Sequence, residues 1–286
     1  MAYPYRPYKS VSTGAEIVEY CKKADLAASR TSDYLISDYR PPFTEYFVNK
    51  EYVFFFDHGS KLEYCFPEKH LLRWREQGGS WNEEYYEALE STAGEVFLIH
   101  HLRRDILPYG CTTLIVDLRT ELVTWISMTL GTPECDRNVN RKLYFGYFGM
   151  LKEQRHAYTD ELCGVILDWK YSESFIIRHE YVTLDWALSP GEPSENAEDY
   201  LFRKFLPAKY VKVRDRLYIM TFIEDGGTDI CFLIDMKKLR NVGAFFGMGD
   251  QGRLACFTVG AKAGLGKFGF DGKYAIPYGP EGGRVP

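Results

Sequence analysis

The sequence predicts an all-β protein made of two antiparallel β-barrels in tandem, with a short helical extension before them. Short apolar segments follow one another along most of the 286 residues, with turn residues between them. One pattern is present twice, at residues 111–128 and 230–248: an apolar run, an Asp, basic residues and a second apolar run ending in Met. Aromatic residues make up 16% of the chain, and β-structure favours aromatic side chains.

The first 42 residues differ from the rest and are predicted to form the helical extension. Thr13-Gly14-Ala15-Glu16 matches a capping box, which is a helix start signal. We expect a helix from Gly14 to Leu26, and a second short helix over Asp33 to Asp38. This segment is expected to flank or plug the mouth of a barrel.

Residues 43–150 are predicted to form the first barrel and residues 158–262 the second. Each contains about eight strand-like segments, and the clearest hairpin signal between two of them is Asp225-Gly226-Gly227. An up-and-down barrel of about eight strands can hold one small ligand. Residues 263–286, rich in Gly and Pro, are predicted to run over the surface as a tail.

Four anchors pair the two halves at spacings of about 110 to 120 residues, which supports a tandem duplication. The matched pairs are Trp74 with Trp186, Phe97 with Tyr218, Asp117 with Asp235, and the segments 142–149 with 253–260. The two similar stretches, residues 111–128 and 230–248, are then the same hairpin in two similar barrels. We expect their Asp117 and Asp235 to be structural, because Asp at a turn hydrogen-bonds its own backbone.

Charge and cysteine usage exclude several classes of protein. The formal net charge is −5 and the basic clusters are short, so nucleic acid is not expected as a partner. No apolar run approaches the roughly 18 residues that suggest a membrane span. The seven cysteines include no C-x-x-C pair, and the start of the chain lacks the apolar core of a signal peptide. We therefore expect a cytoplasmic protein with free thiols.

The short motifs in the chain predict no cofactor and no metal. Gly264 to Gly269 matches G-x-G-x-x-G, but neither a helix pattern nor an acidic residue about 20 positions on follows it. His179-Glu180 starts like a zinc-protease helix, but position 183 is Thr. The cysteines in strand-like segments, Cys111 among them, have no zinc-site spacing and are expected to be small buried hydrophobes.

Strand alternation indicates which side chains face the barrel interiors. In the second half, His179 and Tyr181 share a face with Phe175, and Glu224 ends the apolar row of Tyr218. An inward His is either a satisfied core residue or a proton donor and acceptor suited to neutral pH. The predicted catalytic candidates are His179, Tyr181, Glu224 and His101, and the predicted substrate-binding residues are Trp169, Tyr171, Phe175, Trp186, Tyr64, Arg103 and Tyr218.

The two halves differ at matched positions, which favours a single site. By parity His101 and Arg103 face inward in the first half, where they would meet an anionic ligand, and His100 faces outward. The second half has the cleaner strand pattern. We expect the site there, walled by Trp169, Tyr171, Phe175, His179, Tyr181 and Trp186. The alternative is a symmetric pair of filled barrels with the ligand at their junction.

Two sets of segments resemble a known family, the molybdenum cofactor biosynthesis protein F (MoaF) family. Residues 179–188, 217–225 and 231–247 resemble its C-terminal half, and residues 86–102 and 112–126 its N-terminal half. The resemblance covers roughly residues 43–262 and implies two calycin-like, lipocalin-like barrels. Ile223 stands where the family usually has a basic residue. The family name implies molybdopterin metabolism, although nothing in the sequence indicates pterin chemistry.

The sequence leaves more than one function open. Our first hypothesis is a cofactor-independent lyase, isomerase or cyclase that acts on an aromatic or polyketide-like metabolite by general acid–base chemistry. The alternatives are a non-catalytic lipocalin-like binding protein and an accessory protein of molybdenum cofactor metabolism, the latter resting on the resemblance alone. The expected partner is a small molecule. The sequence does not predict the oligomeric state, and a homodimer is compatible with it.

Overall fold

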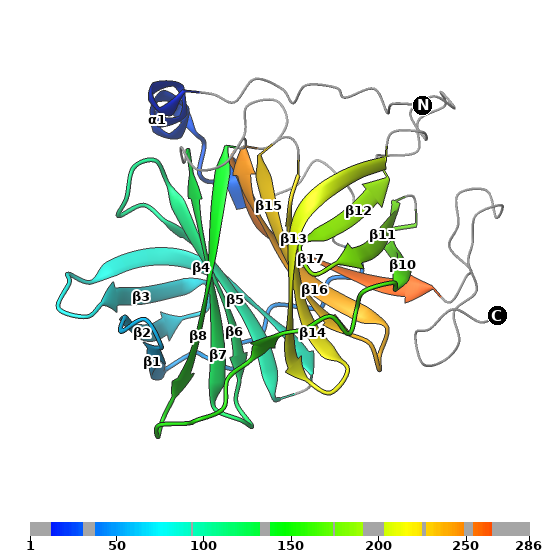
Figure 1. Ribbon diagram of the computed structural model, residues 1–286. Helices are drawn as coiled ribbons and strands as arrows, with labels where there is room; N and C mark the ends of the chain where they lie inside the picture. The colour runs from blue at the N-terminus through cyan, green and yellow to red at the C-terminus, as the bar shows by residue number, and fades with distance from the viewer. Residues whose placement is uncertain are drawn as a thin grey trace.

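The computed structural model describes residues 13–30, 38–92, 94–131, 138–173, 175–190, 203–224, 227–248 and 254–264. It is an all-β protein with two closed eight-stranded antiparallel barrels in tandem and one short α-helix near the N-terminus (Figure 1). No helix in the described part of the chain has the length and apolar character needed to cross a membrane. Most of the expected second helix (residues 33–37) and the expected tail from residue 265 lie outside the described residues.

Helix α1 (Gly14–Lys23) begins at the capping box that the sequence contains. The Glu16 amide donates to the Thr13 hydroxyl at 3.3 Å, and the Glu16 carboxylate accepts from the Thr13 amide at 2.6 Å. The helix ends before the expected Leu26, because Ala24 already has an extended backbone. A 3₁₀ turn, η1 (Ala28–Arg30), follows. Ile17 and Cys21 of α1 pack into the apolar core between the barrels.

The first barrel is closed by antiparallel pairing of its first and last strands. At this closure Gly146 pairs with Phe56, and a Cβ at Gly146 would lie 2.2 Å from the Phe55 carbonyl oxygen. The two backbones can approach this closely only because residue 146 has no side chain. In chain order the strands are β1 (Lys50–Phe56), β2 (Lys61–Glu68), β3 (Leu71–Glu76), β4 (Asn82–Thr92), β5 (Val96–Arg103), β6 (Gly110–Asp117), β7 (Leu122–Leu130) and β8 (Val139–Phe148).

The second barrel repeats this topology, with closure through β12 and β13. A short extra strand, β9 (Ala157–Tyr158), pairs with Val211 and Lys212 of β13, beyond the part of β13 that pairs with β12. The barrel strands are β10 (Ile166–Lys170), β11 (Ile176–Thr183), β12 (Trp186–Pro190), β13 (Arg203–Arg214), β14 (Leu217–Ile223), β15 (Thr228–Asp235), β16 (Arg240–Met248) and β17 (Leu254–Gly264).

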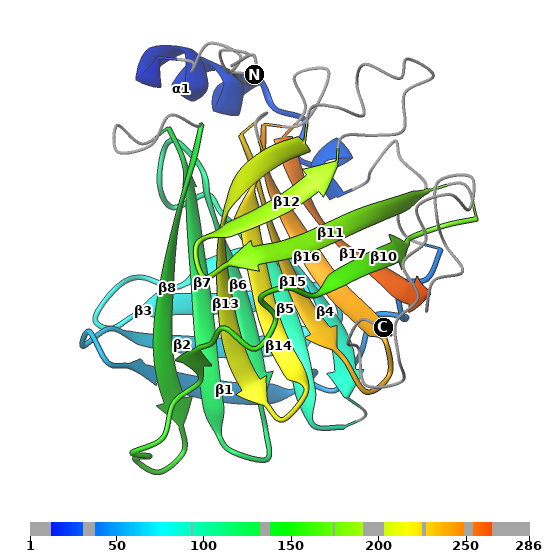
Figure 2. The same cartoon turned by 45° about the vertical axis from the view of Figure 1, so that its right-hand side comes forward.

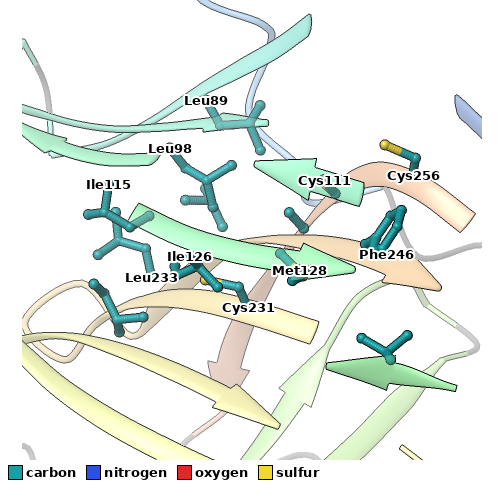
Figure 3. Close-up of a cluster of buried hydrophobic side chains, with 14 of the residues drawn as sticks. Leu89, Leu98, Cys111, Ile115, Ile126, Met128, Cys231, Leu233, Phe246 and Cys256 are labelled. Carbon is teal, nitrogen blue, oxygen red and sulfur yellow. The ribbon is translucent and has the colours of Figure 1, made fainter. Parts of the chain in front are cut away.

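Apolar side chains form three cores, one inside each barrel and one between them. The barrels lie side by side, with β4, β5, β7 and β8 facing β15, β16 and β17 (Figures 1 and 2). Figure 3 shows side chains from both barrels in the core between them. Every residue of β6 and of β15 is buried, because one face of each strand lines a barrel and the other packs against the neighbouring barrel.

The repeated stretch of the sequence is one hairpin made twice, β6–β7 and β15–β16. In the first, Asp117 Oδ1 accepts from the amides of Arg119 and Thr120 at 3.0 and 3.1 Å. In the second, Asp235 Oδ1 accepts from the amides of Lys237 and Lys238, both at 2.9 Å. The structural role predicted for these two Asp residues is confirmed.

Candidate functional site

The interior of the second barrel holds His179, which is 2% exposed. Strand alternation directs it inward from β11, where the ring centroids of Phe222, Phe232 and Tyr181 lie 5.4, 5.5 and 6.3 Å from its own. Nδ1 of His179 is buried and makes no hydrogen bond with any part of the chain that the structure describes. A buried polar atom without a partner costs free energy, so the atom marks a place where a ligand group or water would be stabilised.

Burial sets the electrostatic state of this imidazole. It lowers the pKa of His179 to about 3, because the charged form loses its hydration inside the barrel. His179 is therefore neutral at pH 7. A neutral imidazole offers one donor and one acceptor nitrogen, which suits hydrogen bonding to a ligand.

Four more of the predicted residues lie inside the same barrel. The Trp169 indole donates to the Tyr181 hydroxyl at 3.0 Å, and the rings of Tyr171 and Phe175 lie 6.0 Å apart. The hydroxyl of Tyr171 is buried and has no hydrogen-bond partner among the described residues. Burial raises the pKa of Tyr171, against the opposing effect of the nearby Asn241 side chain. The structure thus brings His179, Tyr181, Trp169, Tyr171 and Phe175 into one aromatic interior.

Asn241 of β16 also belongs to this interior, and the sequence did not predict it. Its side-chain Oδ1 accepts from the Ala261 amide at 3.0 Å, and its Nδ2 is buried with no partner within the described ranges. No short motif surrounds Asn241 in the sequence. Only its inward parity on a strand otherwise rich in apolar residues could have identified it.

Trp186 is not part of the wall, and its expected position there is wrong. It is 43% exposed, whereas the next residue, Ala187, is buried in the barrel interior. The pairing of β11 with β12 shifts by one residue between Tyr181 and Thr183. A one-residue shift moves every following side chain to the opposite face, so Trp186 points out of the barrel although its counterpart Trp74 points in.

The other two predicted residues of this half lie at the ends of the barrel. Tyr218 belongs to the interior cluster, but its hydroxyl donates to Glu161 at 2.6 Å. Glu224 follows the last residue of β14 and is half-buried. These positions agree with their inward parity.

The first barrel contains a second inward histidine, His101, whose two ring nitrogens are both occupied. Nδ1 lies 2.9 Å from the Leu102 carbonyl oxygen, and Nε2 lies 3.0 Å from the Tyr64 hydroxyl. A carbonyl oxygen can only accept, so Nδ1 carries the proton and Nε2 accepts from Tyr64. Burial lowers the pKa of His101 to about 3. His101 is thus a neutral core histidine held by two hydrogen bonds.

Arg103 is the cation that the sequence placed beside His101. Its guanidinium lies 4.6 Å from the Trp74 ring centroid and pairs with Asp105 at 2.7 Å. Asp105 therefore competes with any anionic ligand for this guanidinium. Trp74, which the sequence analysis used only as an anchor of the duplication, has a buried Nε1 with no partner among the residues described.

A third group of side chains meets between the barrels. His100 points out of the first barrel, as its parity predicted, toward Cys111 and Cys256. The ligand atoms of these three buried residues all lie within 4.8 Å of one another, a set that could hold a metal ion. In the thiol pair, the hydrogen bond with Cys111 lowers the pKa of Cys256, and burial raises the pKa of Cys111. The sequence expectation of no metal missed this group, because Cys256 reaches it only through packing of the two barrels.

Comparisons with known families match both halves of the chain. The model of the MoaF N-terminal domain matches residues 33–132, and the model of the MoaF C-terminal domain matches residues 156–266. A search of curated proteins found no match.

Proposed function

Because this chain belongs to the MoaF family and has its two barrel domains, we propose that it binds one small molecule inside its second barrel through His179. The fold and the family are consistent with a small-ligand-binding barrel protein or with a protein related to the molybdenum cofactor. The choice of barrel and of the residues that contact the ligand is part of the proposal.

The observation that carries the proposal is the difference between the two inward histidines. His101 uses both ring nitrogens within the first barrel. His179 has a buried Nδ1 for which the described residues provide no partner. Binding a ligand hydroxyl or carbonyl would satisfy this atom, and an unsatisfied buried polar group costs roughly 1–3 kcal/mol. Of the two inward histidines, His179 is therefore the one with a ring nitrogen left for a ligand.

The interior of the barrel indicates the chemistry of the ligand. Aromatic rings surround His179, and the buried Tyr171 hydroxyl and Asn241 side-chain amide, which lie next to each other, add hydrogen-bonding groups to the same interior. The interior cluster consists of apolar and aromatic side chains. A planar aromatic or polyketide-like molecule with a few hydroxyl or carbonyl groups fits these surroundings better than a polyanion.

Catalysis is an extension of this proposal. A lyase, isomerase or cyclase reaction would need His179 to accept or donate a proton, with Tyr181 and Glu224 as the further candidates in the same barrel. The pKa of about 3 makes His179 a weak base at pH 7. An acidic ligand group beside Nδ1 would raise that pKa toward the useful range. The properties of the site before a ligand binds favour binding, with turnover as the second candidate function.

Mass spectrometry of small molecules that copurify with the full chain would identify the ligand, and titration of that compound would measure its affinity. We expect His179→Phe, which keeps a ring but removes Nδ1, to weaken binding by about 10-fold or more, since one lost hydrogen bond is worth roughly 1–2 kcal/mol. The matched variant in the first barrel is Trp74→Phe, which removes an equally buried and unpaired N–H. It should leave the affinity unchanged.

The reverse result would contradict the proposal: a loss of binding in Trp74→Phe with normal binding in His179→Phe would place the ligand in the first barrel. Conversion of the bound compound, followed by chromatography, separates the two candidate functions. Turnover that falls about 100-fold in His179→Phe at saturating compound would support the catalytic extension. Bound compound that stays unchanged in the wild-type protein would support a binding protein.

A further inference from the structure

His100, Cys111 and Cys256 come from three strands of two barrels. His100 is on β5 and Cys111 on β6 of the first barrel, and Cys256 is on β17 of the second. The three side chains are at most 8% exposed, and Figure 3 labels Cys111 and Cys256 at the same side of the core between the barrels. This group is distinct from the barrel interiors, because all three residues face the junction.

The spacing of the three atoms fits a tetrahedral metal ion. Nε2 of His100 lies 3.4 Å from Cys256 Sγ and 3.7 Å from Cys111 Sγ. With Zn–S of about 2.3 Å and Zn–N of about 2.0 Å, neighbouring ligand atoms of a tetrahedral zinc ion are separated by roughly 3.5 Å. Cys256 Sγ is already placed for this, whereas Cys111 Sγ lies 3.4 Å from Nδ1 and must shift toward Nε2 before the two thiols and the imidazole share one ion.

The other ring nitrogen of His100, Nδ1, has a hydrogen-bond partner, as the second nitrogen of a metal-bound histidine usually does. Nδ1 lies 2.9 Å from Thr113 Oγ1. A ligating histidine usually hydrogen-bonds through its second nitrogen, which fixes the orientation of the ring. Here that contact leaves Nε2 beside Cys256 Sγ, at 3.4 Å, and free to bind an ion.

Charge also favours a divalent ion with thiolate ligands. Two thiolates and one Zn²⁺ carry no net charge, so the cluster can be buried without an uncompensated ion. Soft thiolate ligands together with an imidazole select zinc over calcium or magnesium. We propose that His100, Cys111 and Cys256 bind one zinc ion that joins the two barrels.

The fourth coordination position would face a small cavity. A cavity of about 40 Å³ is lined by Glu84, Glu87, His100 and Cys256, together with residues of the N-terminal segment. One water molecule needs roughly 10–15 Å³, so water can occupy the fourth position. The Glu87 carboxylate at this cavity accepts from the Thr258 amide at 2.8 Å and from the Thr258 hydroxyl at 2.6 Å, which holds it beside the proposed ion.

The test is the zinc content of the full chain, purified under reducing conditions, exposed to Zn²⁺ and freed of loose metal by gel filtration. We expect about one zinc per chain in the wild type and little in Cys111→Ser or Cys256→Ser. Cys231→Ser is the matched control, because Cys231 is a buried thiol of the same inter-barrel core outside the cluster. It should retain its zinc.

A measurement on the wild-type protein covers the case in which a variant fails to fold. Substituted Co²⁺ should show the visible bands of tetrahedral cobalt and a thiolate-to-cobalt charge-transfer band, with X-ray absorption giving two sulfur ligands and one imidazole. The proposal would be overturned if the reduced wild-type protein takes up no zinc. It would also be overturned if Cys111 and Cys256 form a disulfide and no zinc binds. Equal loss of zinc in Cys231→Ser would overturn it as well. None of these results depends on whether a ligand binds in the second barrel.

Discussion

Arg141 of the first barrel donates to Asp229 of the second across 3.0 Å, and the two side chains are 6% and 0% exposed. This buried ion pair joins β8 to β15 at the junction of the barrels. Burial raises the pKa of Asp229 to about 6, against the opposing effect of Arg141. The second carboxylate oxygen of Asp229 has no partner in the described part of the protein. The Asp229 charge therefore depends on Arg141 for its compensation.

Replacement of Arg141 by Met should destabilise the protein strongly. Removing one member of a buried pair leaves an uncompensated charge, which costs roughly 3–5 kcal/mol. A raised folded pKa means that the stability contributed by Asp229 is present below about pH 4 and is lost as the pH rises through about 6. Urea unfolding of Arg141→Met should thus show a larger loss of unfolding free energy at pH 8 than at pH 5.

Lys142→Met is the control, because it changes the exposed neighbouring residue. It should have little effect on stability at either pH, and an equal loss in both variants would contradict this account.

Most of the fold followed from patterns that act locally. Strand alternation gave the inward faces of His179 and His101 and the outward face of His100, because each strand keeps its parity until a bulge interrupts it. The duplication gave the number of barrels. Trp186 was misplaced because a one-residue register shift in β11–β12 leaves no signal in a single sequence.

The junction site could not be predicted for a different reason. Cys111 and Cys256 lie on different barrels and far apart in the sequence, and the contact between them depends on how the outer faces of the sheets pack. Side-chain spacing along one strand carries no information about that packing. The same holds for the pairing of Asp117 with Arg214, in which Nε donates to Oδ2 at 2.6 Å, across the two barrels.

Acidification should destabilise the protein through its buried histidines. The folded pKa values of His179 and His101 are lowered to about 3 and that of His156 to about 4. A lowered histidine pKa means that the unfolded chain binds the proton more tightly, so stability is lost as the pH falls below about 6.5.

The contribution of His179 can be isolated with His179→Leu. Between pH 7 and pH 5 the wild type should lose about 2 kcal/mol more free energy of unfolding than this variant, the equivalent of about 1.5 pKa units. The opposite pH dependence of Asp229 is common to both proteins and cancels in the difference. Leu also removes an unpaired buried nitrogen, so the variant should be no less stable than the wild type at pH 5. Parallel pH profiles for the two proteins would show that His179 is not buried as described.

Closure of the first barrel should depend on the absence of a side chain at Gly146. An added Cβ would lie 2.2 Å from the Phe55 carbonyl oxygen and 2.8 Å from the Phe56 ring, and the first of these neighbours is backbone that cannot rotate away. Gly146→Ala must therefore separate β8 from β1, with the loss of local pairing and an expected cost of about 3 kcal/mol.

Gly14→Ala is the control, because nothing lies within 4 Å of a Cβ there, and Ala favours the helix that Gly14 begins. Urea unfolding followed by tryptophan fluorescence measures both variants, and hydrogen exchange should show faster exchange of the β1 and β8 amides in Gly146→Ala alone. Wild-type stability in that variant would mean that the two strands do not pair as closely as their register requires.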